Sequence, residues 1–229
     1  MKRITIALLL SMLCTRLAYA EMLLDTGPGP DNPIGYSVYG QNSGFGGSGY
    51  YQSLAGQFTT SETWTIDSIL GWMAADPIVP PGPAELHVSI YSNAPSNPAV
   101  YVGTGQPGSV VFTAPFQVTH CSAASQSTCP VGWQGATGLS WNLSPGTYWI
   151  VFEGTGTDTG AVEMPGPVAA PMQNSLFLSK GQDWGELYPG GFGVQITGTT
   201  PVPLPAAAWL LLSAFGAFRL FARRRFCAP

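Results

Sequence analysis

The chain between residues 25 and 200 consists of short stretches in which apolar and polar residues alternate, without a sustained helical periodicity. In ELHVSIYS, residues 85–92, the side chains of Leu86, Val88 and Ile90 point to one side of an extended strand and the polar ones to the other. Glycine, with 29 residues, and proline, with 21, recur between such stretches and favour turns there. This spacing predicts an all-β domain.

Further stretches follow the same rule. In TWTIDSILGW, alternation places Trp64, Ile66, Leu70 and Trp72 on one face of a strand. GTYWIVFEG is apolar on both faces, which is typical of a central strand. The other predicted strands cover residues 109–114, 174–179 and 193–198. We therefore expect a two-sheet antiparallel β-sandwich of the jelly-roll type.

The first twenty residues, 1–20, have the form of a secretory signal peptide. A short basic region precedes an apolar stretch, and Ala18-Tyr19-Ala20 has the small residues that signal peptidase requires. The alternative is a buried first helix, but Arg16 interrupts it. We expect cleavage after Ala20, with Glu21 as the first residue of the mature chain and residues 21–200 as the exported domain.

Cys121 and Cys129 lie eight positions apart in HCSAASQSTCP. An exported chain meets an oxidising compartment, so we expect these two thiols to form a disulfide. Closing so short a loop stabilises the fold by about 2.5 kcal/mol in the chain-entropy model. A zinc site would need further ligands at suitable spacing, which His120 alone does not provide.

The C-terminal segment, residues 201–229, combines a proline-containing motif, an apolar run and a basic cluster. The uncharged run 206–218 would form about 20 Å of helix, and about 26 Å if it extends to Ala222. A cluster of arginines follows and would hold that end in the cytoplasm, leaving the domain outside. These arginines are Arg219, Arg223, Arg224 and Arg225.

This tail resembles the C-terminal sorting signal of PEP-CTERM proteins, in its VPLPA-type variant. The matching motif is Val202, Pro203, Leu204, Pro205 and Ala206, followed by the apolar run and the arginines. Leu204 stands where the commonest form of the motif has Glu. The resemblance implies export by a Gram-negative bacterium that makes exopolysaccharide, transient residence in the inner membrane, and processing by a membrane-embedded exosortase. A plain transmembrane anchor is the alternative.

A second, looser resemblance covers residues 36–198. The stretches LHVSIYSNAP, GQPGSVVFTA, LSPGTYWIVFEG and GFGVQITG are similar to those of choice-of-anchor extracellular domains. The resemblance implies a secreted surface or matrix domain, and it supplies no catalytic residues.

Charge restricts the partners of the domain. All twelve carboxylates of the chain lie between residues 21 and 200, against the single Lys180, so this part has a net charge of −11. A phosphate backbone would be repelled, and no nucleic-acid partner is expected.

Two sets of residues are candidate binding sites. Aromatic side chains in Gly-rich segments could form a platform for a sugar ring, although large aromatic residues also fill cores. They are Trp133, Trp141, Trp184 and Tyr188. Glu153, Asp158 and Glu163 surround a Gly/Thr turn and are a candidate calcium site, the alternative being a solvated loop. Apart from calcium, no metal or cofactor is expected.

Three functions remain in view. The first is a non-enzymatic exported protein of the cell surface or extracellular polysaccharide matrix, sorted through its tail. The second is a carbohydrate-binding module that uses the aromatic platform. The third is a secreted hydrolase, which the absence of a Gly-x-Ser-x-Gly motif disfavours. We expect no enzymatic activity and no catalytic residues.

Overall fold

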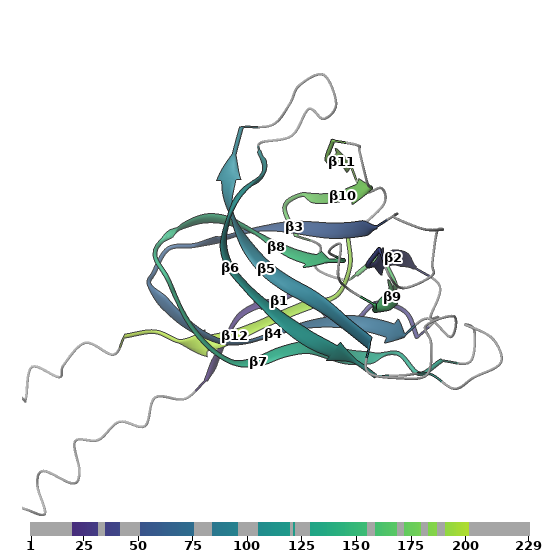
Figure 1. Ribbon diagram of the computed structural model, residues 1–229. Coiled ribbons are helices and arrows are strands. Elements are labelled where there is room, and N and C mark those ends of the chain that lie inside the picture. The colour runs from purple at the N-terminus through teal and green to yellow at the C-terminus, as the bar shows by residue number, and fades with distance from the viewer. Residues whose placement is uncertain are drawn as a thin grey trace, which may run out of the picture.

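The computed structural model describes most of the predicted domain. The described residues are 20–31, 35–41, 51–75, 84–95, 105–119, 121, 129–154, 159–168, 172–179, 183–186 and 191–201. Within them there are twelve β-strands and no helix, and every strand pair is antiparallel. The prediction of an all-β, antiparallel domain is confirmed (Figure 1).

The strands follow one another in chain order. They are β1 (Glu21–Asp25), β2 (Tyr36–Tyr39), β3 (Gln52–Thr60), β4 (Trp64–Ala75), β5 (Ala84–Ala94), β6 (Gln106–Val118), β7 (Gly132–Leu143), β8 (Gly146–Glu153), β9 (Ala161–Met164), β10 (Ser175–Ser179), β11 (Gly185–Glu186) and β12 (Val194–Thr199).

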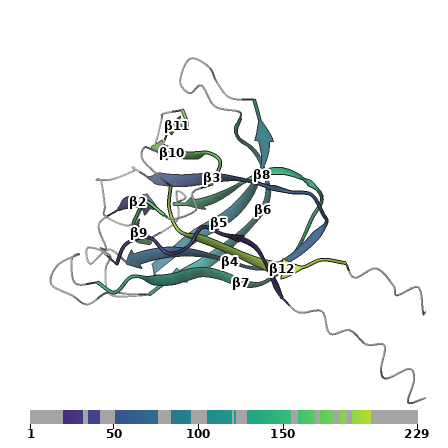
Figure 2. The same cartoon turned by 180° about the vertical axis from the view of Figure 1, so that it is seen from behind.

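Hydrogen bonding arranges these strands in two ladders. The first ladder has the order β1-β12-β4-β7, and the second has the order β11-β10-β3-β8-β5-β6. The ladders are joined because the end of β4 turns to pair with β9, and β9 continues through β2 to β3. Figures 1 and 2 show the first ladder below the second, with β4 running beneath β3 and β8, a sandwich-like arrangement.

The main core lies between the two ladders. Leu86, Val88 and Ile90 of β5 are fully buried in it, as alternation predicts. Phe152 of β8 packs edge-to-face on Phe116 of β6 and on Phe192, with ring centroids 6.2 Å apart in both pairs. This geometry places the positive edge of one ring against the negative face of the next. Three aromatic rings thus connect both ladders at the centre of the domain.

Strand β8 is central, as its two apolar faces predict. It pairs with β3 on one side and with β5 on the other. Ile150 and Phe152 face the main core, whereas Trp149 and Val151 are buried on the opposite face. There they pack against residues of the neighbouring strands and form a second apolar cluster. The members of this second cluster are Ala55, Trp149, Val151 and Leu176, with Tyr91 and Trp184 packed against them.

Strand β4 departs from the predicted alternation. A register shift between Ile66 and Ser68 interrupts its pairing with β7. Trp64 and Ile66 face the core, but after the shift Ile69 and Met73 are the buried residues. The expectation that Leu70 and Trp72 share the core face with Trp64 is therefore wrong. The pairing with β12 explains why both of them move to the outer face. Ile66 pairs with Gly198 and Ser68 with Thr197, so β4 has one extra residue there, and a shift of one residue reverses the side to which a side chain points.

The two ends of the described domain lie side by side. Glu21 at the start of β1 is paired with Gly198 near the end of β12, and both views show these strands adjacent (Figure 2). The predicted leader before Ala20, the motif 202–206 and the arginine cluster lie outside the described residues. Within the described residues, no helix is long and apolar enough to cross a membrane.

The central ring predicts a large stability effect. Phe152→Ala is expected to lower the free energy of unfolding by about 3–5 kcal/mol, because it leaves a cavity beside Phe116 and Phe192. Val110→Ala is the control on a side chain that is 50% exposed, with an expected change below about 0.5 kcal/mol. Urea denaturation measures both, and equal losses in the two variants would contradict the central position of Phe152.

Candidate functional site

The structure does not bring the predicted aromatic platform together. Trp133 lies on the outer face of the first ladder, Trp141 faces the main core, and Trp184 packs against the second cluster. Tyr188 lies outside the described residues. The three described tryptophans therefore belong to three different surroundings.

Trp141 is turned inward by an irregularity in β7. Its ring stacks on that of Phe112, with centroids 5.2 Å apart and planes 10° from parallel, and both rings pack against the core. Ile66 pairs with Trp141 while Ser68 pairs with Thr137, so two steps along β4 correspond to four along β7. Positive φ angles in this part of β7, 72° at Gly138 and 56° at Ser140, accommodate the extra residues.

Trp133 forms a pair with Trp72, which alternation grouped with Trp64 and which was not among the predicted binding residues. It is directly opposite Trp72 in the β4–β7 ladder, and the two ring centroids are 5.3 Å apart with an interplanar angle of 64°. Both indoles are partly exposed. We call this the tryptophan pair. The only feature of the sequence that relates to this pair is Trp72 itself, and strict alternation from Trp64 would have placed its side chain in the core.

The segment after β1 passes beside Trp72. Gly27 has a φ of 76° and donates its N–H to the Asp25 carboxylate at 2.9 Å, which is a turn stabilised by an Asx side chain. The turn leads to Pro30, whose carbonyl oxygen lies 3.4 Å from the Trp72 indole nitrogen as hydrogen-bond acceptor. The sequence DTGPGP thus produces a local turn that supports one side of the tryptophan pair.

Thr26 holds this segment against β12, and a backbone hydrogen bond holds Trp72 beside the start of β12. Thr26 is fully buried, and its hydroxyl accepts the N–H of Val194 at 2.7 Å. The backbone N–H of Trp72 donates to Gly193 at 2.9 Å, and a Cβ atom at Gly193 would come within 2.5 Å of the Trp72 Cβ. Glycine at this position therefore leaves room for the start of the Trp72 side chain.

The rest of the outer face of the first ladder is mainly polar, apart from Leu70 and Met22. Gln195 donates to the Asp25 carboxylate at 3.4 Å in the row next to the tryptophan pair. The following rows hold a 2.6 Å hydrogen bond between the hydroxyls of Ser68 and Thr197, and a 2.9 Å bond from Thr65 to Asn142. Among the described residues of the whole chain there is no lysine or arginine.

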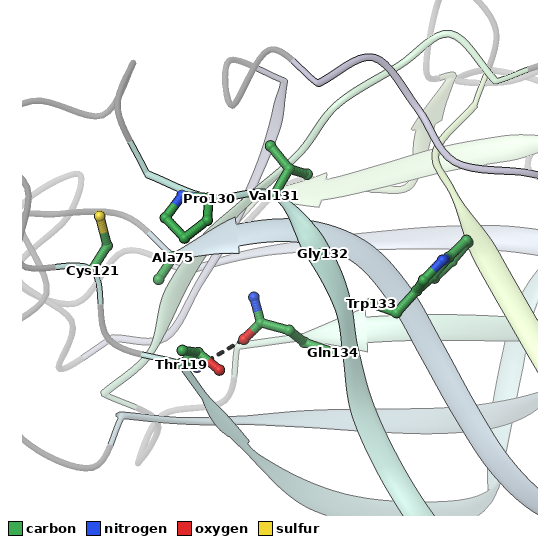
Figure 3. Close-up of a pocket in the computed structure, with 8 residues that line it drawn as sticks. All are labelled: Ala75, Thr119, Cys121, Pro130, Val131, Gly132, Trp133 and Gln134. Atoms are coloured by element: carbon green, nitrogen blue, oxygen red, sulfur yellow. Dashed lines mark hydrogen bonds between the residues drawn. The ribbon is translucent and has the colours of Figure 1, made fainter.

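A small hollow lies next to Trp133, at the start of β7 (Figure 3). Its volume is about 210 Å³, and it is lined by Ala75, Thr119, Cys121, Pro130, Val131, Gly132, Trp133 and Gln134. Gln134 accepts the Thr119 N–H at 2.7 Å and donates to the Met73 carbonyl at 3.1 Å. Figure 3 shows Gln134 directed toward Thr119 and the Trp133 indole directed the other way. The hollow is smaller than the roughly 300–1,000 Å³ of usual ligand pockets.

The hollow borders the predicted disulfide. Cys121 and Cys129 are bonded in the structure, with their Cα atoms 5.6 Å apart, and both are buried. Cys121 lies three residues after the end of β6, and Cys129 lies three residues before the start of β7. The bond therefore ties the connection between the two ladders at this end of the domain.

A polar cluster occupies the outer face of the second ladder. Glu153 accepts hydrogen bonds from the hydroxyls of Ser89 and Tyr91, the latter at 2.9 Å. Burial raises the pKa of Tyr91, and the charge and hydrogen bond of Glu153 raise it further, so the phenol remains a donor at neutral pH. Ser89 is fully buried, although its position in β5 predicts a solvent-facing side chain.

His87, Ser89 and Glu153 share this face, a combination that resembles the parts of a hydrolytic triad. His87 is paired with Glu153 across the strands. The Ser89 hydroxyl, however, donates to Glu153 and has no exposed surface, so a substrate carbonyl could not approach it. The geometry makes Ser89 a support for the carboxylate.

A neighbouring set of amides completes the outer face. The Asn93 side-chain oxygen accepts the Trp149 indole N–H at 2.8 Å and the Gln57 amide at 3.1 Å. The Gln57 oxygen in turn accepts from Asn174 beside β10. These bonds satisfy polar groups that are buried beside the second cluster, which the sequence pattern did not indicate.

The candidate calcium ligands are only partly described. Glu163 of β9 is buried and accepts the Ser37 hydroxyl at 2.6 Å, whereas Glu153 serves the polar cluster, and Asp158 lies outside the described residues. No group of three or more His, Cys, Asp or Glu side chains within the described residues could hold a metal. Calcium binding stays a prediction for the loop that contains Asp158.

No protein-family model matches this chain, and no curated protein matches it. A function therefore has to be inferred from its own residues.

The contact that holds the segment beside Trp72 can be tested directly. Thr26→Val keeps the shape of the side chain but leaves the buried Val194 N–H without its hydroxyl acceptor, so we expect a loss of about 1–3 kcal/mol in unfolding free energy. The matched control is Thr65→Val, whose bond to Asn142 is exposed, with an expected change below about 0.5 kcal/mol. Chemical denaturation distinguishes them; an unchanged Thr26→Val variant would show that this contact contributes little.

Proposed function

We propose that this chain is an exported, non-enzymatic protein of the cell surface or extracellular polysaccharide matrix. In this proposal the signal peptide 1–20 directs export, and an exosortase-type enzyme of the inner membrane processes the tail at the motif 202–206. The organism is a Gram-negative bacterium, in keeping with the resemblance of the tail. The single observation that carries the proposal is the Cys121–Cys129 disulfide, because such bonds persist in oxidising compartments and are rare in the cytosol.

The position of the chain ends supports the same proposal. Glu21, the expected first residue of the mature chain, is paired with Gly198, and the motif begins three residues after Thr199. Both processing events would therefore take place at one end of a folded domain. The opposite end, which contains the tryptophan pair, would project away from the membrane until the tail is cut.

The strand order supports the finer assignment of the fold. We infer a two-sheet jelly roll in which β1-β12-β4-β7 forms one sheet and β3-β8-β5-β6 the other. This is the pairing that eight strands adopt when two Greek keys wrap around a barrel, with β2, β9, β10 and β11 as additions. A jelly roll also agrees with the resemblance to choice-of-anchor extracellular domains.

The absence of catalysis is part of the proposal. Its support is the arrangement of His87, Ser89 and Glu153, in which the serine hydroxyl is buried and engaged with the carboxylate. A surface or matrix protein needs a stable, protease-resistant scaffold and a means of attachment, and the disulfide and the tail would supply these.

Mass spectrometry of the protein recovered from its own cells tests the sorting proposal. We expect a mature N-terminus at Glu21 and a C-terminus near Pro205, and we expect a variant with Arg223, Arg224 and Arg225 changed to Ala to accumulate unprocessed. An intact Pro229 in the surface fraction would indicate a plain anchor. Full-length chain in the cytoplasm, with both thiols reduced, would refute export.

The disulfide itself predicts a measurable stabilisation. Cys121→Ser is expected to lower the unfolding free energy by about 2.5 kcal/mol, because the open loop restores entropy to the unfolded chain. Reduction of the native protein should reproduce the loss, whereas the reductant should leave the Cys121→Ser variant unchanged. Denaturation curves with and without reductant provide the measurement; identical curves for the native protein would argue against a bond that forms in the mature protein.

A further inference from the structure

We propose that the outer face of the β1-β12-β4-β7 ladder is a binding site for a neutral polysaccharide, with Trp72 and Trp133 as its contact residues. The two indoles are neighbours in register on adjacent strands, and both are partly exposed. Tryptophan is the largest apolar side chain, and its flat ring suits the C–H face of a pyranose. A partly exposed pair of such rings is unusual unless a partner covers them.

The tryptophan pair is held in place before any ligand binds. Trp72 is bounded on one side by Trp133 and on the other by Gly193, whose missing side chain leaves space for it. The indole N–H is directed to the Pro30 carbonyl, and the buried Thr26 fixes the segment that carries Pro30. A rigid aromatic surface loses little conformational entropy on binding, which favours affinity.

Polar groups adjoin the tryptophan pair at the spacing of the sheet. Gln195 of β12 is in the next row, about 7–8 Å from Trp72 as a diagonal neighbour on the adjacent strand. Asp25 of β1 lies in the same row one strand further, about 10 Å or more across the sheet from Trp72. The Asp25 carboxylate has two oxygens and can accept hydroxyl hydrogen bonds in addition to those from Gly27 and Gln195. Ser68 and Thr197 follow in the row after that. Sugars present apolar ring faces and hydroxyl edges together, and this face offers partners for both.

The charge of the face selects the class of sugar. The domain from residue 21 to 200 has a net charge of −11, and its described part contains no lysine or arginine. Among the described residues, uronate, sulfate and phosphate groups would find carboxylates and no lysine or arginine to pair with. The ligand is therefore a neutral glycan and not an acidic polysaccharide.

The shape and position of the face favour a polymer. The face is a strand surface, and the hollow beside it is about 210 Å³, with its glutamine already paired. A small sugar would be held too weakly there, whereas successive rings of a chain can contact both indoles. Trp72 is hydrogen-bonded to Gly193, which comes just before β12, and the tail begins after β12. The six residues of β12 span about 20 Å. The tryptophan pair thus lies at the end of the domain away from the tail.

This inference deepens the proposed function. It rests on the proposed export only because an exported protein would encounter the polysaccharide outside the cell. Binding by the purified protein does not depend on the leader or the tail. Failure to bind sugar would leave the sorting results unchanged, and a cytoplasmic location would leave the binding results unchanged.

Affinity electrophoresis of the full chain in mild detergent tests the site. The gels contain neutral polymers (cellulose ethers, mixed-linkage β-glucan, xylan, galactomannan, dextran) or acidic ones (alginate, hyaluronan). We expect retardation by at least one neutral polymer and by neither acidic one. Trp72→Ala and Trp133→Ala should each weaken binding by at least about tenfold, whereas Trp133→Phe should retain most of it. Trp184→Ala is the aromatic control in the second cluster, and it should stay within about twofold.

Near-ultraviolet circular dichroism and thermal melting confirm that each variant is folded. If Trp72→Ala unfolds the domain, the binding of Trp133→Ala is compared with that of Trp133→Phe to test the site. Trp133 lies on β7, which pairs with β4 alone among the described strands, so its substitution disturbs the fold less. The proposal is overturned if no neutral polymer retards the protein, if acidic polymers bind, or if Trp184→Ala removes binding while both Trp133 variants retain it.

Discussion

Strand β4 is the constraint on which the other parts of this domain depend. Its twelve residues pair with β12 on one side and β7 on the other, and its last two residues turn to pair with β9. It therefore connects the first ladder to the second through β9 and β2, and it determines how they close on the core. The extra residue that β4 holds after Ile66 in its pairing with β12 keeps Ile69 and Met73 buried while it directs Leu70 and Trp72 outward. One local irregularity thus completes the main core and creates the tryptophan pair.

The second ladder differs from the first because its central strand β8 is apolar on both faces, and both faces must be buried. The main core covers one face, through Ile150 and Phe152, and the second cluster around Trp149 covers the other. Burial on that outer face also encloses polar groups, which would be costly if they had no partners. Glu153 with its two hydroxyl donors, and Asn93 with its indole and amide donors, satisfy them. The two outer faces therefore differ, one being covered and the other open.

That difference has a functional consequence in the proposed setting. A protein that its tail holds at a surface can contact a partner through the end of the domain that lies away from the tail. The open face carries two indoles, hydroxyls, amides and carboxylates, and within its described residues no cation; the covered face uses similar side chains for stability. The same residue types therefore have different roles, and burial decides between them. The disulfide lies near the start of β7, and in the proposed oxidising compartment it would stabilise the region around it.

The sequence by itself determined the all-β class, the core-facing residues of β5, the central place of β8 and the pairing of Cys121 with Cys129. Each depends on local spacing: period-two alternation, apolar residues on both faces, or two cysteines in one short loop. Glycine-rich β7 was missed because its residues lack a β-favouring pattern and are held by β4 instead. Three residues of the predicted sugar platform lie apart for a related reason, since Trp141 is turned inward by backbone irregularities and Trp184 packs against the second cluster, away from Trp133. Only the tertiary structure decided that Trp72 and Trp133 meet, because register and bulges are set by pairing between distant segments, which alternation within one strand does not encode.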